Sequence, residues 1–175
     1  MGQLIMIRAL NETDHDSTIN IVNENWRTVY SGYVNSALLS DEGCRIRASE
    51  MKNDFTSQRF EEYIWEENGC VAALLSLGKT EDADKPGAYE LWRIYIAPEM
   101  QGKGIGGKLL NFAEEKAKQK GYTEMLIWAF RENTRAIKFY QKRGFQIDKI
   151  EFLKEPGVIL QMCFTSSTKL SPITA

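Results

Sequence analysis

The chain has few of the residues on which several common kinds of site depend. It contains one histidine, His15, and only three scattered cysteines, Cys44, Cys70 and Cys163, among its 175 residues. His15 falls near the start of the first predicted helix, where we expect it to be solvated. A Ser-His-Asp triad, a Cys-His pair and a histidine-rich metal site are therefore disfavoured, and we predict no metal site. An odd number of scattered cysteines is typical of buried or free thiols in a reducing cytoplasm.

Two further absences limit location and partners. The sequence has no apolar run long enough to span a membrane and no signal peptide at its start. Its net charge of −2 argues against a protein whose main task is to grip nucleic acid. With 43% hydrophobic and 26% charged residues, the chain is typical of a soluble globular protein of one domain. We expect a cytoplasmic protein without a nucleic-acid or membrane partner.

Hydrophobic periodicity and turn signals predict the element order β-α-α-β-β-β-α-β-α-β-β. The sequence around Asn68-Gly69 indicates a hairpin, because Asn-Gly supplies the positive φ angles of a tight turn between two strand-like runs. The other elements expected in the first half are a strand at 4–10, a helix at 11–30 with Ile19, Val22 and Trp26 on one face, a short helix within 36–51, a polar loop at 78–87 and a strand at 88–98.

The second half begins with a glycine-rich loop that opens a long amphipathic helix. Gly121 follows this helix at the position where a left-handed residue is expected. A later helix at 133–144 has Asn133 as its N-cap and Gly144 past its end. The remaining expected elements are a buried strand at 122–130, two closing strands around Pro156-Gly157 and a polar tail from Thr165.

The glycine-rich stretch EMQGKGIGGKLL (99–110) fits three phosphate-binding patterns at once. Residues 102–107 spell G-x-G-x-x-G, residues 102–108 spell G-x-x-x-x-G-K, and residues 101–106 spell Q-x-x-G-x-G. All three share one physical basis, because a glycine-rich turn before a helix lets backbone N–H groups and the helix dipole grip a phosphate. The plain alternative is a loop whose glycines serve only tight turns.

The first two patterns lack the residues that should accompany them. A nucleotide P-loop needs a Ser or Thr hydroxyl after the lysine to hold magnesium, and Leu109 stands there. A dinucleotide fold needs an acidic residue about 20 positions on, at the end of the next strand, and that strand ends in Trp128-Ala129-Phe130. The acyl-CoA pattern is therefore favoured.

Residues far from the loop support the third pattern. The segment 89–146 resembles the cofactor half of the GNAT superfamily of N-acetyltransferases, with a strand ended by proline, Q-x-x-G-x-G-x-x-L-L, a second strand and N-x-x-A-x-x-F-Y-x-x-x-G-F. Over residues 1–88 the resemblance rests on element order and on ENWRTVYSGYV, which is similar to the acceptor-side helix of many bacterial members. Gln101 stands where many relatives have Arg, which is a variant within the family.

The resemblance implies a fold and a domain organisation. The fold is α/β (α+β), with a mixed, mostly antiparallel sheet of six to seven strands, flanked by about four helices and splayed at the cofactor site. We expect a single N-acetyltransferase domain over 1–175, with an acceptor-side half at 1–88, an acetyl-CoA-binding core at 89–146, and closing strands and tail at 147–175.

The resemblance also implies acetyl-CoA (coenzyme A) as cofactor. Pantetheine would pair with the backbone of Ile94 and Ile96, and the N–H of Ile94 would stabilise the oxyanion of the tetrahedral intermediate. The pyrophosphate would lie on the N–H groups of the loop, which Gln101 would brace. The two lysines of the loop could add positive charge near the phosphates. Two solvated lysines at the start of a helix are an equally good interpretation. The full set of expected cofactor-binding residues is Ile94, Tyr95, Ile96, Gln101, Gly102, Lys103, Gly104, Ile105, Gly106, Gly107, Lys108, Asn133 and Tyr140.

Two residues are expected to act in catalysis. By the resemblance, Tyr140 is the general acid that protonates the leaving thiolate; from the residues alone, a core role like that of its neighbour Phe139 is the competing interpretation. A base is also needed, because an ammonium acceptor has a pKa of about 10 and must lose a proton before attack. Glu90, at the start of the cofactor strand, is the first candidate base, with three further carboxylates as alternatives, Glu61, Glu62 and Glu66.

Acceptor specificity is expected from the first half of the chain. Trp26, Tyr30 and Tyr33 could wall the acceptor pocket, although the helical spacing of Trp26 and Tyr30 fits a core role as well. A polyamine, an amino acid, a peptide N-terminus, a protein lysine and an aminoglycoside all stay open as the acceptor. The predicted activity is acetyl transfer from acetyl-CoA to a primary amine by direct attack in a ternary complex. A catalytically idle acyl-CoA-binding regulatory module is the alternative, and a homodimer is left open.

Overall fold

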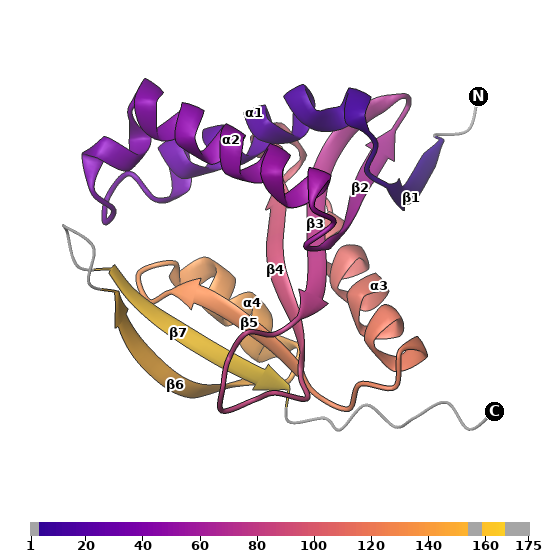
Figure 1. Cartoon of the computed structure of the whole chain (residues 1–175), viewed down its shortest axis with the longest axis vertical. Coiled ribbons are helices and arrows are strands. Elements are labelled where there is room, and N and C mark those ends of the chain that lie inside the picture. Colours follow the sequence, from indigo (N-terminus) through magenta and orange to yellow (C-terminus); the bar gives the residue numbers. More distant parts are fainter. Residues whose placement is uncertain (1–3, 154–158, 167–175) are drawn as a thin grey trace. The chain divides into compact units, whose positions relative to one another are not determined.

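The computed structural model describes residues 4–153 and 159–166 of the chain (Figure 1). The chain divides into two compact units, the first made of residues 1–77 and 93–110 and the second of residues 78–92 and 111–175. Strands β3 (Cys70–Lys79) and β4 (Tyr89–Ile96) and helix α3 (Ile105–Gln119) each contribute residues to both units.

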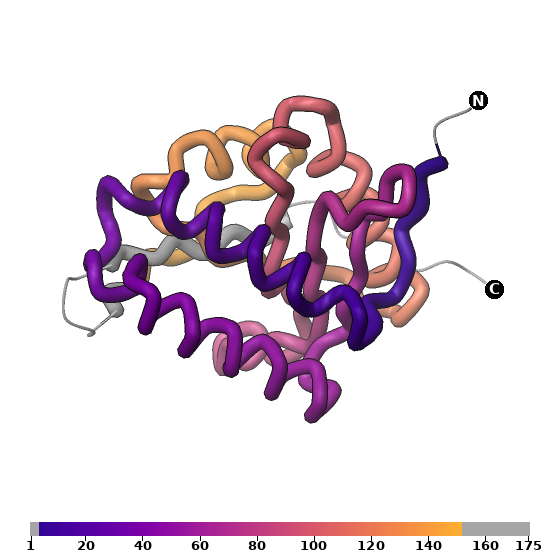
Figure 2. The backbone as a smooth tube through the Cα atoms, turned by 90° about the horizontal axis from the view of Figure 1, so that it is seen from above, coloured from indigo at the N-terminus to yellow at the C-terminus, as the bar shows by residue number. Residues whose placement is uncertain are grey.

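The first unit combines an antiparallel sheet with two helices. Strand β1 (Ile5–Ala9) pairs with β2 (Glu61–Glu67), and β2 pairs with β3. Helices α1 (His15–Val29) and α2 (Asp41–Thr56) run side by side (Figure 2). Their buried core cluster consists of Leu10, Ile19, Val22, Met51, Ile64 and Leu74, with Trp26 packed against it. The predicted apolar face of the first helix is therefore confirmed.

The hairpin between β2 and β3 follows from its local sequence. Asn68 has φ 52° and Gly69 has φ 80°, so both turn residues adopt the left-handed region that a tight primed turn requires. The predicted hairpin is confirmed. Its first strand has Ile64 and Trp65 in the interior, and its second strand is buried from Ala72 to Gly78.

The second unit contains the other part of the sheet. The first residues of β4 pair in parallel with β5 (Met125–Phe130), in a register that joins Tyr89 to Met125 and Leu91 to Ile127. Strand β7 (Ile159–Ser166) lies between β5 and β6 (Phe145–Leu153) and is antiparallel to both. Helix α4 (Thr134–Lys142) precedes β6. The observed order of α-helices and strands, and the mixed, mostly antiparallel pairing, confirm the predicted fold class.

Some element boundaries differ from those expected. The helix expected within 36–51 is a short 3-10 turn, Ser36–Leu39, followed by α2, which begins after Ser40 and continues to Thr56. Ser40 starts the longer helix because its hydroxyl oxygen accepts a hydrogen bond from the N–H of Gly43 at 3.1 Å. Thr165, expected to begin the tail, still pairs in β7. The expected Pro156-Gly157 turn and the tail after residue 166 lie outside the described residues.

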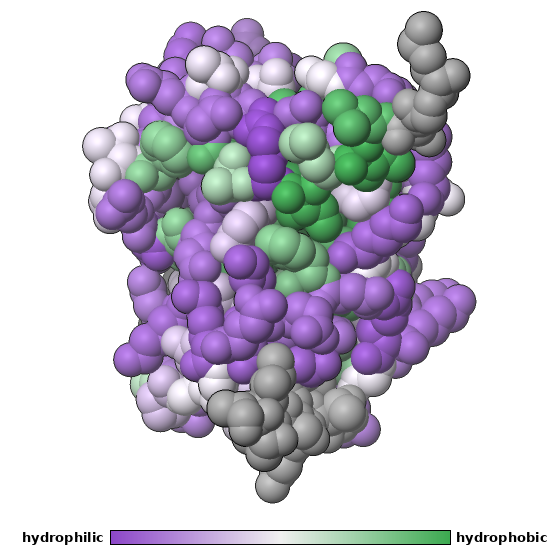
Figure 3. Space-filling model, turned by 90° about the vertical axis from the view of Figure 1, so that its right-hand side faces the viewer, coloured by the Kyte–Doolittle hydropathy of each residue, from purple (hydrophilic) through white to green (hydrophobic). Residues whose placement is uncertain are grey.

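One edge of the first unit is apolar. Leu4, Ile5 and Met6, in and beside the edge strand β1, are exposed, and a hydrophobic area lies next to the N-terminal residues in Figure 3. Cys44 is half-buried and Cys70 is exposed, and both are free thiols, as predicted. The side chain of Cys163 is not among the described side chains.

In the part of the chain that the structure describes, no helix combines the length and apolar character needed to cross a bilayer.

Candidate active site

The glycine-rich loop lies between a 3-10 turn, Pro98–Met100, and the start of α3. Gly102 and Gly104 have φ angles of 80° and 82°, a region that other residues rarely adopt. A Cβ atom on either glycine would meet no other atom within 4 Å, so the backbone faces open space. The N–H of Lys108 donates to the carbonyl of Gly104, which places the first turn of α3 at residues 105–107. N–H groups of a first turn have no acceptor within their helix and can grip an anion.

Asn25 of α1 holds the end of β4 against this loop. Its side-chain amide donates hydrogen bonds of 2.9 Å to the carbonyls of Ile21 and Ile96. Gln101 donates to Oδ1 of Asn25 at 3.1 Å and to the carbonyl of Ile96 at 3.2 Å. The predicted bracing residue therefore works together with Asn25, a buried residue that the sequence did not reveal.

The end of β4 provides backbone groups beside this network. The N–H of Ala97 donates to the carbonyl of Ala72 on β3 at 2.9 Å, so the strand is held by pairing as well as by Asn25. The carbonyl of Ile96 already accepts two hydrogen bonds, which uses both of its lone pairs. A pantetheine N–H would therefore need a different acceptor on this strand, and Ile94 is the next residue of the expected set.

The two lysines of the loop differ in their surroundings. Lys103 is exposed and its Nζ lies 3.3 Å from Sδ of Met100. Nζ of Lys108 lies 5.3 Å from the ring centroid of Trp65 on β2, a cation–π contact. Both lysines are exposed, and Lys108 is the one in contact with an aromatic ring.

The three aromatic residues expected at the acceptor site are neighbours. The rings of Trp26 and Tyr30 meet edge to face with centroids 5.1 Å apart, and those of Tyr30 and Tyr33 lie 5.8 Å apart. The indole N–H of Trp26 donates to the hydroxyl of Tyr95 on β4 at 3.2 Å. Trp26 also packs against the core, so it supports the cluster from the inside while the two tyrosines extend it.

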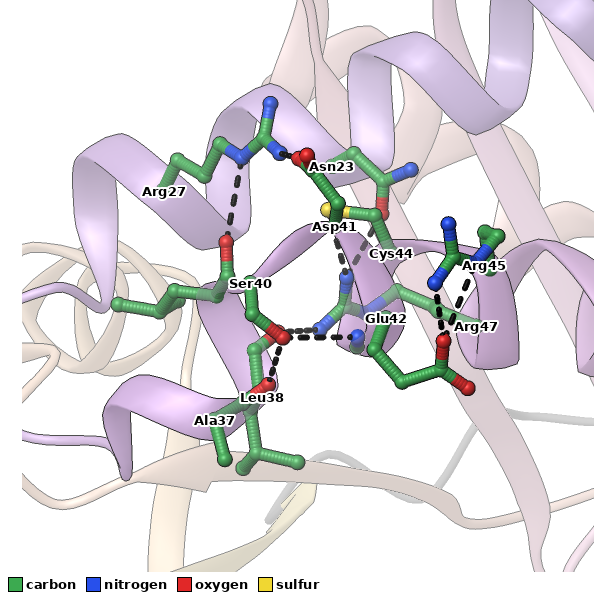
Figure 4. Close-up of polar contacts among 12 residues, drawn as sticks. Asn23, Arg27, Ala37, Leu38, Ser40, Asp41, Glu42, Cys44, Arg45 and Arg47 are labelled. Atoms are coloured by element: carbon green, nitrogen blue, oxygen red, sulfur yellow. Dashed lines mark hydrogen bonds and ion pairs between the residues drawn. The ribbon is translucent and has the colours of Figure 1, made fainter.

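Arginines fix the segment between α1 and α2 (Figure 4). Arg47 of α2 donates to Oδ1 of Asn23 at 2.6 Å and to the carbonyl of Leu38 at 2.7 Å, and its guanidinium lies 4.0 Å from the ring centroid of Trp26. Burial lowers the pKa of Arg47, against opposing effects of Cys44 and Tyr95. Arg27 of α1 pairs with Asp41 at 2.8 Å. The aromatic cluster is therefore attached to a braced segment.

In the second unit, Glu90 lies in the interior. It is buried, and the hydroxyl of Thr80, also buried, donates to its Oε2 at 2.6 Å. Glu90 thus lies near the start of β4, as expected, with its side chain in the interior. A buried carboxylate held in a fixed position is suited to accepting a proton.

Tyr140 and Asn133 lie on α4 of the same unit. Tyr140 is buried beside Phe139 and Phe145, with ring centroids 5.3 and 6.0 Å away. Oδ1 of Asn133 accepts from the N–H of Ala136 at 3.2 Å, which confirms the predicted N-cap. Both residues have structural roles, and the catalytic role of Tyr140 and the pantetheine contact of Asn133 stay predictions.

The alternative carboxylates are each engaged in the first unit. Glu66 pairs with Arg8 at 2.7 Å. Glu62 accepts from the Ser76 hydroxyl at 3.0 Å and lies 3.5 Å from Arg93. Burial raises the pKa of Glu62, and the contacts with Ser76 and Arg93 oppose that rise.

Glu61 is the last of the alternative bases, and the single histidine, His15, lies in the same unit. The hydroxyl of Tyr63 donates to Glu61 at 3.2 Å. The prediction that His15 is solvated is wrong: its ring is buried and stands edge-on to Phe55, with centroids 4.5 Å apart. Within residues 4–153 and 159–166, no group of acidic, histidine and cysteine side chains is arranged to hold a metal ion.

The structure thus gathers the expected residues in two sets. The first unit holds the glycine loop, Gln101, residues 94–96 and the aromatic cluster, and the second holds Glu90, Asn133 and Tyr140. The signals that located the loop and the N-cap are local in sequence. Asn25 and Thr80 carry no such signal, since their partners are 76 and 10 residues away.

Comparison with known proteins identifies the family of this chain. A profile of the acetyltransferase (GNAT) family matches residues 21–145. A spermidine N(1)-acetyltransferase of Thermoplasma acidophilum is 30% identical over 147 residues, which are 82% of this chain and 89% of that protein.

Solved structures share the fold. The crystal structure of PaiA N-acetyltransferase from Thermoplasma acidophilum in complex with coenzyme A has a TM-score of 0.73 at 24% identity, covering 91% of this chain and 98% of that one. YncA of Salmonella typhimurium, a putative acetyltransferase solved with its cofactor acetyl-CoA, has a TM-score of 0.70 at 20% identity, covering 98% and 97%.

The chain belongs to the acetyltransferase (GNAT) family. This membership confirms the predicted class of enzyme, an acyl-CoA-dependent acyltransferase, and with it coenzyme A as the class of cofactor. It leaves the acceptor and the roles of individual residues to be argued from the site.

Proposed function

We propose that this protein transfers the acetyl group of acetyl-CoA to a primary amine by direct attack, without a covalent enzyme intermediate. The observation that carries the proposal is the loop at Gly102 and Gly104, with its left-handed glycines, its open surroundings and its position at the start of α3. This geometry suits a pyrophosphate, and the family assignment supports coenzyme A as its source.

Three residues of this chain would each carry out one part of the reaction. Acetyl-CoA supplies the activated acetyl group as a thioester. Glu90 would take a proton from the acceptor ammonium, directly or through water, so that the amine lone pair can attack the thioester carbon. The N–H of Ile94 would stabilise the negative charge that develops on the carbonyl oxygen. Tyr140 would protonate the thiolate that leaves, and the nitrogen would give up its second proton, which restores the Tyr140 hydroxyl; the products are an acetamide and free CoA.

A small amine is the first class of acceptor to test. The relative from Thermoplasma acidophilum is named for spermidine, which makes a polyamine the first acceptor to try. Trp26, Tyr30 and Tyr33 could hold the hydrocarbon part of such an amine by apolar and cation–π contact. The same proposal keeps two further predictions. The acceptor amine can also belong to a peptide or a protein, and the protein acts in the cytoplasm.

The alternative is a catalytically idle acyl-CoA-binding module that regulates a partner. The presence of a buried carboxylate at Glu90 and a tyrosine at 140 favours an active enzyme. An idle module would bind acetyl-CoA but release no CoA thiol with any amine.

Two measurements test the proposal in sequence. Acetyl-CoA should raise the melting temperature of the purified protein well above the effect of ATP-magnesium or NAD, since a ligand that binds only the folded state stabilises it. Release of CoA thiol should then depend on added amine, in a panel led by polyamines. A larger stabilisation by NAD would contradict the cofactor, and stabilisation by acetyl-CoA without thiol release over the whole panel would support the idle module.

A further inference from the structure

Three arginines of α1 and α2 lie around the segment between these helices (Figure 4). Arg27 pairs with Asp41, and its side chain is 49% exposed. Arg45 pairs with Glu42, and its side chain is 73% exposed. Arg47 is half-buried, yet no carboxylate in the described part of the chain forms an ion pair with it. The arginine with the least access to water is thus the one without a counterion.

The charge of Arg47 is costly where it lies. A guanidinium stays protonated at neutral pH, so it cannot avoid the cost of burial by losing its proton. Burial lowers the pKa of Arg47, and the opposing effect of Glu50, a carboxylate on the same helix, is weaker than those of Cys44 and Tyr95. Buried charges in proteins are normally paired with a charge of the opposite sign. An anionic group beside this guanidinium would therefore bind favourably.

The bracing of the two helices does not require this charge. Nη1 of Arg47 donates to Oδ1 of Asn23 at 2.6 Å and Nη2 donates to the carbonyl of Leu38 at 2.7 Å, and both acceptors are neutral. The contact of Nη1 with Sγ of Cys44 is long, at 4.0 Å. Nε–H and the second N–H of Nη2 have no acceptor among the described residues. A carboxylate can accept from two such N–H groups of one guanidinium at once.

Arg47 borders both the proposed acceptor site and the cofactor strand. Its guanidinium lies 4.0 Å from the ring centroid of Trp26, whose indole N–H donates to the hydroxyl of Tyr95 at 3.2 Å. Tyr95 stands on β4 between Ile94 and Ile96, the residues proposed to bind pantetheine. All five residues belong to the first unit. Two aromatic side chains thus connect the cation to the strand at which the thioester is expected.

We propose that the acceptor carries a carboxylate as well as its amine, as a free amino acid does, and that Arg47 binds this carboxylate. The inference rests on the proposed acetyl transfer and names the class of acceptor for it. Tyr30 and Tyr33, with ring centroids 5.8 Å apart, would contact the apolar part of the amino acid. A polyamine offers Arg47 no anionic group and adds like charges that repel it. A polyamine is therefore the contrasting acceptor in the test.

The first experiment compares each amino acid with its own amide. L-Leucine, L-methionine and L-phenylalanine, and the amide of each, are titrated by calorimetry into the full-length protein saturated with CoA, which gives no turnover. At about pH 6.5 the amino groups of acid and amide are both protonated, so each pair differs only in the carboxylate. We expect at least one acid to bind about tenfold more tightly than its amide, as hydrogen bonds between charged groups do. If no acid binds more tightly than its amide, the proposal is wrong.

Substitutions connect this preference to Arg47. Arg47→Gln keeps N–H donors but removes the charge, so the ratio of the Kd values of amide and acid should fall to about 1. Arg47→Lys keeps the charge without the planar fork and should retain part of the preference. Arg45→Gln, on the exposed side of the same helix, is the matched control and should keep the wild-type ratio. Damage to the fold weakens acid and amide alike, so a wild-type ratio in Arg47→Gln would contradict the proposal.

Release of CoA thiol from acetyl-CoA, with the same compounds and with spermidine, tests the proposed function separately. Release with spermidine but with none of the acids would sustain acetyl transfer and overturn this inference. Tighter binding of an acid than of its amide, without thiol release from any acceptor, would sustain Arg47 as a carboxylate-binding residue and overturn acetyl transfer.

Discussion

The side-chain amide of Gln101 donates a hydrogen bond to Oδ1 of Asn25 across 3.1 Å, and both amides also donate to the carbonyl of Ile96. These hydrogen bonds join three elements: helix α1, the end of β4 and the glycine loop. The loop that is proposed to hold the pyrophosphate is therefore positioned by a residue of α1.

Asn25→Leu should disturb the loop without touching the ligand. The amide of Gln101 loses its acceptor and Ile96 loses a donor, so we expect the free energy of unfolding to fall by about 1–3 kcal/mol. The KM for acetyl-CoA should rise more than kcat falls, because a displaced loop weakens binding first. Urea unfolding and initial rates measure both effects. Asn20→Leu, exposed on the same helix, is the control; an unchanged KM with lowered stability would make Asn25 a structural residue only.

Gly104→Asp should abolish the rise in melting temperature caused by acetyl-CoA. The substitution places a side chain and a negative charge where the backbone should approach a phosphate. Gly69→Asp is a closely matched control, because Gly69 has φ 80° and open space around it but lies in the β2–β3 turn. Both variants should lose some stability from backbone strain, and only the loop variant should lose the response to acetyl-CoA. Equal responses in the two would argue against a phosphate at this loop.

Tyr140→Phe keeps the ring and its packing but removes the hydroxyl. If the hydroxyl protonates the leaving thiolate, kcat should fall by roughly 10²–10⁴ while the affinity for acetyl-CoA changes little. Tyr122→Phe, in a ring stacked on Tyr89 in the same unit, should leave turnover near wild type. Unchanged kcat in the Tyr140 variant, under conditions where chemistry limits the rate, would remove Tyr140 from the catalytic residues.

Glu90→Gln keeps an oxygen that can accept from Thr80 but removes the base. The rate should fall strongly at pH 7, and the defect should shrink as the pH rises toward the acceptor's own pKa of about 10, where the free amine forms without help. A pH–rate profile of variant and wild type checks this. A defect of constant size across that pH range would assign Glu90 a structural role. Thr80→Val should show a milder version of the same profile, since it removes only the hydroxyl that orients the carboxylate.

Arg8 should make stability depend on pH in the acid range. Its hydrogen bond to Asp14, and secondarily its charge, hold the pKa of that buried carboxyl below the ordinary value. A lowered folded-state pKa stabilises the protein at pH values above about 4, and this contribution is lost as the pH falls through the lowered value. The difference in unfolding midpoint between wild type and Arg8→Met should thus be largest near neutrality and shrink below roughly pH 4. A difference that stays constant down to pH 2 would contradict this account.

The sequence by itself determined the elements and the features that depend on neighbours in the chain. The Asn68-Gly69 turn, the cap at Asn133 and the left-handed Gly121 after α3 all appear where the sequence predicts them. Each is a local effect, because backbone sterics and a side chain a few residues away decide the conformation. The order of helices and strands follows for the same reason, since hydrophobic period is a property of short segments.

Tertiary structure alone decided which polar residues are buried and with which partners. Asn25 meets Gln101 from a distance of 76 residues in the sequence. Glu90 acquires its donor from Thr80, and His15 is buried against Phe55 on another helix, where the sequence predicts solvation. A polar side chain shows no periodic signal that distinguishes burial from exposure. Only the packing of distant segments determines whether it loses water and what replaces the water.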